Sequence, residues 1–158
     1  MTDNPITSVQ VRRAERADVP AIVRLLADDH LGATREIVSD PVAQVYLDAF
    51  DAMAAHQGNE LFVAERDGDV VGCLQLDIIH GLSRMGMTRG QIEGVRVSSA
   101  HRGHRIGEQL VRAAIDRARE RGCRAVQLTS DRTRVDAHRF YERLGFVTSH
   151  VGMKLTLE

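Results

Sequence analysis

Several residue types are scarce in this 158-residue chain, and each shortage narrows what the protein can be. It has no tryptophan, its aromatic content is 4%, and it has only two cysteines. Cys73 and Cys123 lie far apart without CxxC spacing, so we expect neither a zinc ribbon nor a redox pair. Both thiols are expected to be reduced and to serve as small apolar side chains.

Long apolar runs and signals for export are also missing. No apolar run reaches the roughly 20 residues that a membrane span needs, and the start MTDNPITS lacks the basic-then-apolar order of a secretion signal. We therefore expect a cytoplasmic protein with no membrane partner.

The charges are nearly balanced, and the histidines are scattered. Lys and Arg number 21 against 22 Asp and Glu, a net charge of -1, which gives no reason to expect a nucleic acid partner. The seven histidines include no HxxxH or HxH pair, so we expect no metal site. The length suits a single domain spanning residues 1–158.

Hydrophobic periodicity, capping residues and turn signals divide the chain into a series of short elements. Strands are expected at 8–13, 61–66, 70–79, 91–97, 125–129, 146–150 and 153–157, and helices from Asp18 to about 28, from Pro41 to about 58, from 106 to Gly122 and at 136–144. Loops are expected at 32–40 and 80–90. The turn Asp67, Gly68, Asp69 predicts an antiparallel hairpin. The order indicates an α/β fold with a mixed sheet, and it does not fit the strict alternation of a Rossmann or barrel fold.

The most informative motif is RGHRIG at 102–107, between a strand and the first turn of a helix. The first helical turn has unpaired N–H groups and the positive end of the helix dipole, so it can hold a diphosphate. Gly103 and Gly107 permit close approach, and Arg102, His104 and Arg105 add side chains around the anion. A P-loop is excluded because no Lys precedes a Ser or Thr, and there is no GxGxxG. The alternative is an ordinary glycine-containing helix entry with solvated arginines.

The same residues resemble the signature of the GNAT superfamily of N-acetyltransferases, a strand followed by RxxGxG/A and a helix. The preceding Glu93, Val95 and Val97 and the later AHRFYERLGF extend this resemblance over roughly 91–146. It implies a mixed central sheet of six to seven strands with about four helices, and acetyl-CoA as co-substrate.

The resemblance also implies residue roles. The Val95–Val97 strand would part from its parallel neighbour and pair with the pantetheine arm, and the 102–107 amides would hold the diphosphate. The implied cofactor-binding residues are Val95, Val97, Arg102, Gly103, His104, Arg105, Ile106, Gly107, Ala137 and Phe140. Two departures stand out: Arg105 replaces a usual glycine, for which we expect an ordinary helical φ, and Arg134 replaces an Asn that often contacts CoA.

Transfer to an amine requires a base and an acid, because an alkylammonium has a pKa near ~10. Glu93 is the expected base, directly or through water, although it could instead be a strand carboxylate paired with an arginine. Tyr141 is the expected acid for the CoA thiolate, and its alternative is a packed aromatic. A backbone N–H of 95–97 would hold the oxyanion.

The acceptor is expected to be a small-molecule primary amine. Arg35, His80, Arg84 and Arg89 lie in or beside the two loops and favour an acceptor that also bears an acidic group, unless these are solvated charges. The segment RVDAHRFYERLGFVTSH is similar to the C-terminal part of aminoalkylphosphonate N-acetyltransferases. A protein substrate and an acyl-CoA-binding sensor without turnover remain alternatives, and a homodimer is compatible with the resemblance.

Overall fold

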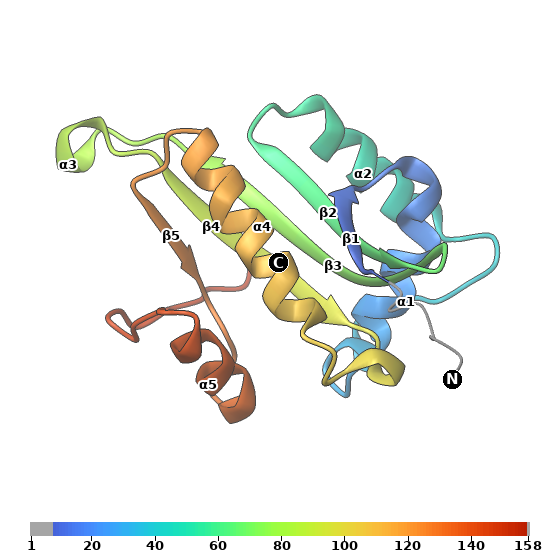
Figure 1. Ribbon diagram of the computed structural model, residues 1–158. Coiled ribbons are helices and arrows are strands. Elements are labelled where there is room, and N and C mark those ends of the chain that lie inside the picture. Colours follow the sequence, from blue (N-terminus) through green and yellow to red (C-terminus); the bar gives the residue numbers. More distant parts are fainter. Residues whose placement is uncertain (1–7, 158) are drawn as a thin grey trace.

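The computed structural model describes residues 8–157, which form one sheet with helices packed against it (Figure 1). The strands are β1 (Gln10–Arg13), β2 (Asn59–Arg66), β3 (Asp69–Ile79), β4 (Arg89–Val97) and β5 (Ala125–Leu128). The helices are α1 (Val19–Ala27), α2 (Gln44–Ala55), the single turn α3 (Ser83–Gly86), α4 (Ile106–Glu120) and α5 (Val135–Arg143). Within these residues the strand order is β1-β2-β3-β4-β5, antiparallel except for the parallel β4–β5 pair.

The predicted hairpin between β2 and β3 is confirmed. Arg66 pairs with Asp69, so the connection has two residues, Asp67 and Gly68, both with positive φ (55° and 85°). Two successive positive φ values are those of the hairpin turn whose twist matches that of the strands, and Asp-Gly is a favoured sequence for it. The hairpin sets the register between β2 and β3.

Apolar residues fill both faces of the sheet. On one face Leu110, Val111, Ala114 and Ala118 of α4 join the core with alternate strand residues such as Leu74, Leu76 and Ile92. On the other face Ile22 and Leu25 of α1 pack with Val63 and Cys73. Burial raises the pKa of the Cys73 thiol to about 12. Cys73 and Cys123 are both free, as expected.

Two expectations about element bounds are wrong. α2 begins at Gln44 rather than at Pro41, because Ala43 has an extended ψ of 137° and forms the N-cap. In the described part of the chain the residues after α5 form no strand, so the sheet has five strands and not six or seven. The C-terminal segment does alternate apolar and polar residues, but no strand pairs with it among residues 8–157. Its apolar side chains are therefore each at least 80% exposed: Val147, Val151, Met153, Leu155 and Leu157.

No helix in residues 8–157 is both long enough and apolar enough to cross a membrane.

Candidate active site

The two parallel strands separate beside a cleft. β4 pairs with β5 only from Arg89 to Ile92, opposite Ala125 to Leu128, and the remaining β4 residues have no partner on that side within the described chain. A cleft of about 450 Å³ lies beside this free half of β4. It is lined by Asp29, His30, Val95, Arg96, Val97, Arg102, Thr133, Arg134, Val135, Asp136 and Ala137. The structure therefore brings Val95, Val97, Arg102 and Ala137 of the predicted cofactor residues to one place.

A β-bulge in β4 accompanies this separation. The pairs Cys73–Arg96 and Gln75–Glu93 leave Leu74 opposite both Gly94 and Val95. Gly94 has a φ of 59°, which favours glycine at this position. A bulge bends its strand and leaves one residue out of the hydrogen-bonded ladder. The strand expected at 91–97 did not include this bulge, although a glycine inside a strand pattern, here Gly94, is a sequence signal for one.

The loop before α4 carries unpaired amides, as predicted. Among residues 8–157 we find no acceptor for the backbone N–H groups of 102–108, and the ladder of α4 starts at Gln109 N, which donates to Arg105 O (3.1 Å). Gly103 has a φ of 82°. Arg105 also has a left-handed backbone (φ 59°, ψ 18°), so the expectation of an ordinary helical φ there is wrong. Arg105 is the N-cap, and the tight entry to α4 requires the left-handed backbone.

One side chain from outside the motif and one from within it hold this loop in place. Asp28 accepts hydrogen bonds from Ser99 N (2.7 Å) and Ser99 Oγ (3.1 Å). His104 Nδ1 lies 3.2 Å from His101 O and 3.1 Å from Arg102 O, so its ring is bound to the loop backbone. The loop is thus fixed from α1 and from within.

Gly107 lies on the first turn of α4, next to Phe140 of α5 and Val97 of β4. A Cβ at Gly107 would lie 3.5 Å from Phe140 Cζ and 3.6 Å from Val97 Cγ2, ordinary contact distances. The missing Cβ at Gly107 leaves space next to Phe140 and Val97, although a Cβ there would not clash with either side chain. This places Phe140, Gly107 and Val97 side by side at the helix entrance.

One carboxylate joins three segments around the cleft. Asp29 Oδ2 lies 3.5 Å from Arg96 Nε of β4 and 3.6 Å from Arg134 Nη2 at the start of α5. Its Oδ1 accepts from Gly32 N at 2.6 Å. Burial raises the pKa of Asp29, but this hydrogen bond and the two arginines outweigh it, so the net pKa is lowered. Asp29 and Arg96 were not among the site residues predicted from the sequence, since only the fold brings them together.

Tyr141 is a partly buried phenol on α5. Its ring lies edge to face against Phe140 and Phe146, with centroids 5.0 Å and 5.7 Å away. Burial raises the pKa of Tyr141, while Arg134 and Arg96 act in the opposite direction. A raised pKa keeps the phenol protonated at neutral pH, as a proton donor must be.

Glu93 lies at the point where β4 leaves β5, and it is exposed. Its carboxylate accepts from Gln91 Nε2 (3.1 Å), and Gln91 Oε1 accepts from Gln127 Nε2 (2.7 Å). On neighbouring β3, Gln75 donates to Asp77. Glu93 thus ends a row of polar side chains on an open part of the sheet, and an arginine partner for it is absent from the described residues.

The four predicted acceptor-binding residues are not gathered. His80, Arg84 and Arg89 lie in or next to the β3–β4 connection, which projects with α3 from the end of the sheet away from α1 (Figure 1). Arg35 follows α1 instead, near Asp131, whose pKa is lowered by hydrogen bonds from Thr133 and, to a smaller extent, by the charges of Arg132 and Arg35. His80 Nδ1 is 3.0 Å from Thr88 Oγ1. No common anion site forms from these four described side chains.

Comparison with known proteins agrees with this geometry. The sequence profile of the Acetyltransferase (GNAT) family matches residues 20–146. The chain is similar to an aminoalkylphosphonate N-acetyltransferase of Salmonella typhimurium, with 35% identity over 107 residues, which are 68% of this chain and 69% of that protein.

Two solved structures are similar over nearly the whole chain. A protein of Bacillus halodurans C-125, described as a transcriptional regulator, shares 46% identity with a TM-score of 0.92 over 95% of this chain and 100% of that one. A putative acetyltransferase of Agrobacterium tumefaciens C58 shares 30% identity with a TM-score of 0.84 over 94% of this chain and 99% of that one. The expected α/β fold and coenzyme are thereby confirmed: this chain belongs to the GNAT family of acetyltransferases, as an N-acetyltransferase that uses acetyl-CoA.

Proposed function

We propose that this N-acetyltransferase acts on the primary amine of a small molecule, by direct attack within a ternary complex. The observation that carries the proposal is the cleft lined by the free half of β4 and by Arg102 of the loop with unpaired amides. Glu93 and its polar row lie on the same strand, two residues before the lining residue Val95. Such a cleft can hold a coenzyme and leave the acceptor side open.

The loop and the strand would share the work of holding the coenzyme. The N–H groups of 102–107 and the positive end of α4 would bind the diphosphate, with Arg102, His104 and Arg105 around it. The free backbone of Val95 and Val97 would align the pantetheine arm, and Ala137 and Phe140 of α5 would form the opposite wall. Bound in this way, acetyl-CoA supplies an activated acyl group.

The proton transfers are assigned to Glu93 and Tyr141. Glu93 would remove a proton from the ammonium, directly or through a water, since it is exposed next to the strand separation and not neutralised by an arginine in the described chain. Tyr141 would donate a proton to the leaving thiolate, because its raised pKa keeps the phenol protonated. A backbone N–H of the 95–97 segment would stabilise the oxyanion.

The acceptor would lie along the polar row of Gln75, Asp77, Gln91, Glu93 and Gln127. Amides and carboxylates there favour an amine with further hydrogen-bonding groups. The similarity to an aminoalkylphosphonate N-acetyltransferase makes such amines the first candidates. Arg89 shares a strand face with Glu93 four residues away, roughly 13 Å by strand geometry, so it would contact an acid group only on an extended acceptor.

We also propose that the chain works as a single cytoplasmic domain in a homodimer. The apolar C-terminal side chains, exposed in the isolated chain, are present in every copy, and the outer edge of β5 has no partner strand in the described residues. Pairing of this segment with β5 of a second copy would cover both.

Incubation with acetyl-CoA and an amine panel, followed by free thiol, tests the acceptor class. The panel contains aminoalkylphosphonates, amino sugars, polyamines and peptides with free amines. Thiol release that rises with one small amine supports the proposal, whereas release with peptides alone supports a protein acetyltransferase. Release with none of them, while CoA still binds, supports a sensor. Because one similar structure is described as a transcriptional regulator, salt-dependent retention on DNA is measured in parallel.

A further inference from the structure

A second cavity lies at the other end of α4 from the coenzyme cleft. It has a volume of about 640 Å³ and lies where β1 ends, between α2, the start of β2 and the last turns of α4. β1 pairs only with Phe62–Glu65, so the first residues of β2 have no strand beside them on that edge within the described chain. We call it the Glu60 cavity, after the buried carboxylate that binds three of the arginines lining it. It is lined by Arg13, Phe50, Met53, His56, Arg117 and Arg121, among others.

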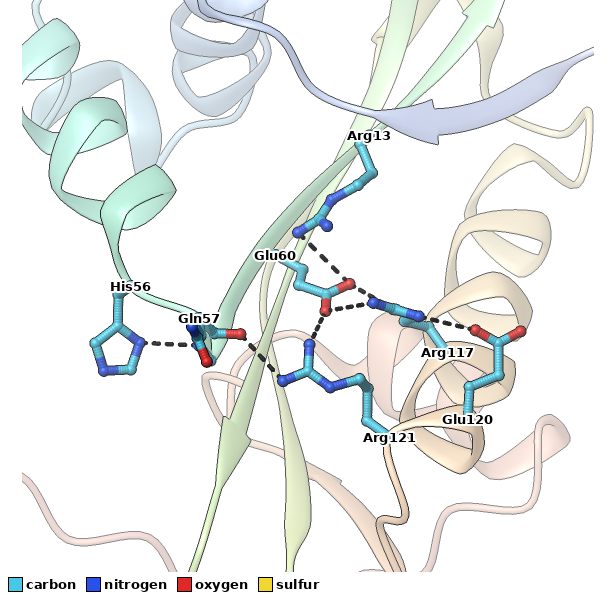
Figure 2. A network of polar contacts seen from close by, with 8 residues as sticks. Arg13, His56, Gln57, Glu60, Arg117, Glu120 and Arg121 are labelled. Atoms are coloured by element: carbon cyan, nitrogen blue, oxygen red, sulfur yellow. Dashed lines mark hydrogen bonds and ion pairs between the residues drawn. The ribbon is translucent and has the colours of Figure 1, made fainter.

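Three arginines converge on Glu60, whose side chain is 0% exposed (Figure 2). Arg117 binds it with two hydrogen bonds, Nε to Oε2 (2.7 Å) and Nη2 to Oε1 (3.0 Å). Arg121 Nη1 donates to Oε1 as well, and Arg13 Nη2 lies 3.7 Å from Oε2. The bidentate pair with Arg117 already neutralises the buried carboxylate, so the other two guanidinium groups exceed what Glu60 needs.

The cavity therefore holds surplus positive charge. Its three guanidinium groups face two carboxylates, Glu60 and Glu120, the second bound to Arg117 Nη1 at 3.0 Å. Among residues 8–157 the Arg13 guanidinium finds no hydrogen-bond acceptor, and its side chain is 60% exposed. Arg13 can therefore turn its donors toward an anion without breaking a bond to the protein.

The opposite wall is apolar and carries a neutral donor. Phe50 and Met53 of α2 face the cavity with Leu61 of β2, and every residue of α2 is at least partly exposed. His56 Nδ1 accepts from Gly58 N (3.1 Å), which in a neutral imidazole leaves Nε2 as the protonated nitrogen. A ligand with an acid head and a short apolar body matches these two walls.

We propose that the Glu60 cavity is a second ligand site, which binds a small organic anion with an apolar body. The acid group lies between Arg13 and Arg121, and the apolar body lies against Phe50, Met53 and Leu61. This site and the coenzyme cleft lie at opposite ends of α4, roughly 20 Å apart along the 15-residue helix. Both can therefore be filled together.

Calorimetric titration of octanoate into the full chain saturated with CoA tests the site. We expect one octanoate per chain, with acetate binding more weakly because it lacks the apolar body and octylammonium not binding. Arg13→Met should weaken octanoate binding by about tenfold, since it removes a charge-assisted hydrogen bond while Glu60 keeps Arg117 and Arg121. The matched control is Arg119→Met on α4, whose guanidinium binds Asp116 outside the cavity.

Four results would overturn the proposed site. Two concern octanoate alone: no saturable binding, or displacement of octanoate by CoA. The other two are comparisons: Arg13→Met binds octanoate as tightly as the unchanged chain, or the unchanged chain binds octylammonium as tightly as octanoate. Unchanged CoA affinity and melting temperature in Arg13→Met show that the variant is folded. Because CoA is titrated separately, loss of the coenzyme site and loss of this second site give different results.

Discussion

Arg134 at the start of α5 lies 3.6 Å from Asp29 at the end of α1, and Arg96 of β4 reaches the same carboxylate oxygen at 3.5 Å. Three segments that are distant in sequence are thereby joined at the cleft beside the free half of β4. Arg134 occupies the position at which the family resemblance leads us to expect an Asn. It lines the cleft, and its side chain is paired with Asp29.

Asp29→Asn should therefore disturb both stability and coenzyme binding. It leaves two partly buried guanidinium groups without a countercharge, which should lower the free energy of unfolding by about 1–3 kcal/mol, and it should raise the KM for acetyl-CoA. Urea unfolding and initial rates measure the two effects. Asp116→Asn, in an exposed pair with Arg119, should change stability by less than about 0.5 kcal/mol. Equal changes in the free energy of unfolding and in KM for the two substitutions would contradict the role given to the Asp29 ion pairs.

Tyr141→Phe should lower turnover by about 10²-fold or more, because the leaving thiolate loses its proton donor. The affinity for CoA should stay nearly unchanged, since the ring and its packing remain. Because the pKa of Tyr141 is raised above its ordinary value of 10, we expect ionisation of this phenol to cause no loss of wild-type activity at any pH below 10. Steady-state rates across pH and CoA titration measure both. The control is Tyr46→Phe, which removes a phenol of α2 that donates to Glu36. Equal rates for Tyr141→Phe and wild type would remove Tyr141 from the mechanism.

Glu60→Gln should destabilise the fold in a pH-dependent way. The net pKa of Glu60 is lowered from 4.5, because its arginine contacts outweigh the opposing effect of burial. A lowered folded-state pKa gives stability that is complete above 4.5 and is lost as the pH falls through the folded value. At pH 7 the substitution should cost about 3–5 kcal/mol, since the arginines lose their buried counterion. Urea unfolding at pH 7 and pH 3 should show the difference narrowing in acid, and a constant difference would contradict the ion-pair account.

Met153→Glu together with Leu155→Glu should shift the chain from dimer to monomer. Both side chains are more than 80% exposed in the single chain, so charges there cost little in a monomer and much in an apolar interface. Sedimentation velocity measures the change. A wild-type chain that is monomeric throughout, or a double variant that remains dimeric, would contradict the proposed pairing of the C-terminal segment with β5.

The sequence predicted those features that depend on residues close together in the chain. The Asp67–Gly68 turn, the helix that begins at Ile106 and the amide-rich entry at 102–107 each follow from local geometry, and all three are found. The closing strands failed because a period-two pattern fixes which side chains share a face but not whether a partner strand exists. Asp29 and Arg96 were missed for a similar reason: only the packing of α1 against the sheet brings this carboxylate to β4. Arg105 shows that a non-glycine residue can take the left-handed backbone when the turn demands it.

The central claim is that the amides at the start of α4 bind the coenzyme diphosphate, and calorimetric titration of CoA into two Gly107 variants tests it most directly. Gly107→Ala adds a Cβ at ordinary contact distance from Phe140 and Val97, so it should keep CoA affinity within about threefold of wild type, because the amides are retained. Gly107→Asp adds a carboxylate at the same point and should abolish binding by repelling the diphosphate, with the melting temperature nearly unchanged. Unaltered CoA binding by Gly107→Asp would contradict the account.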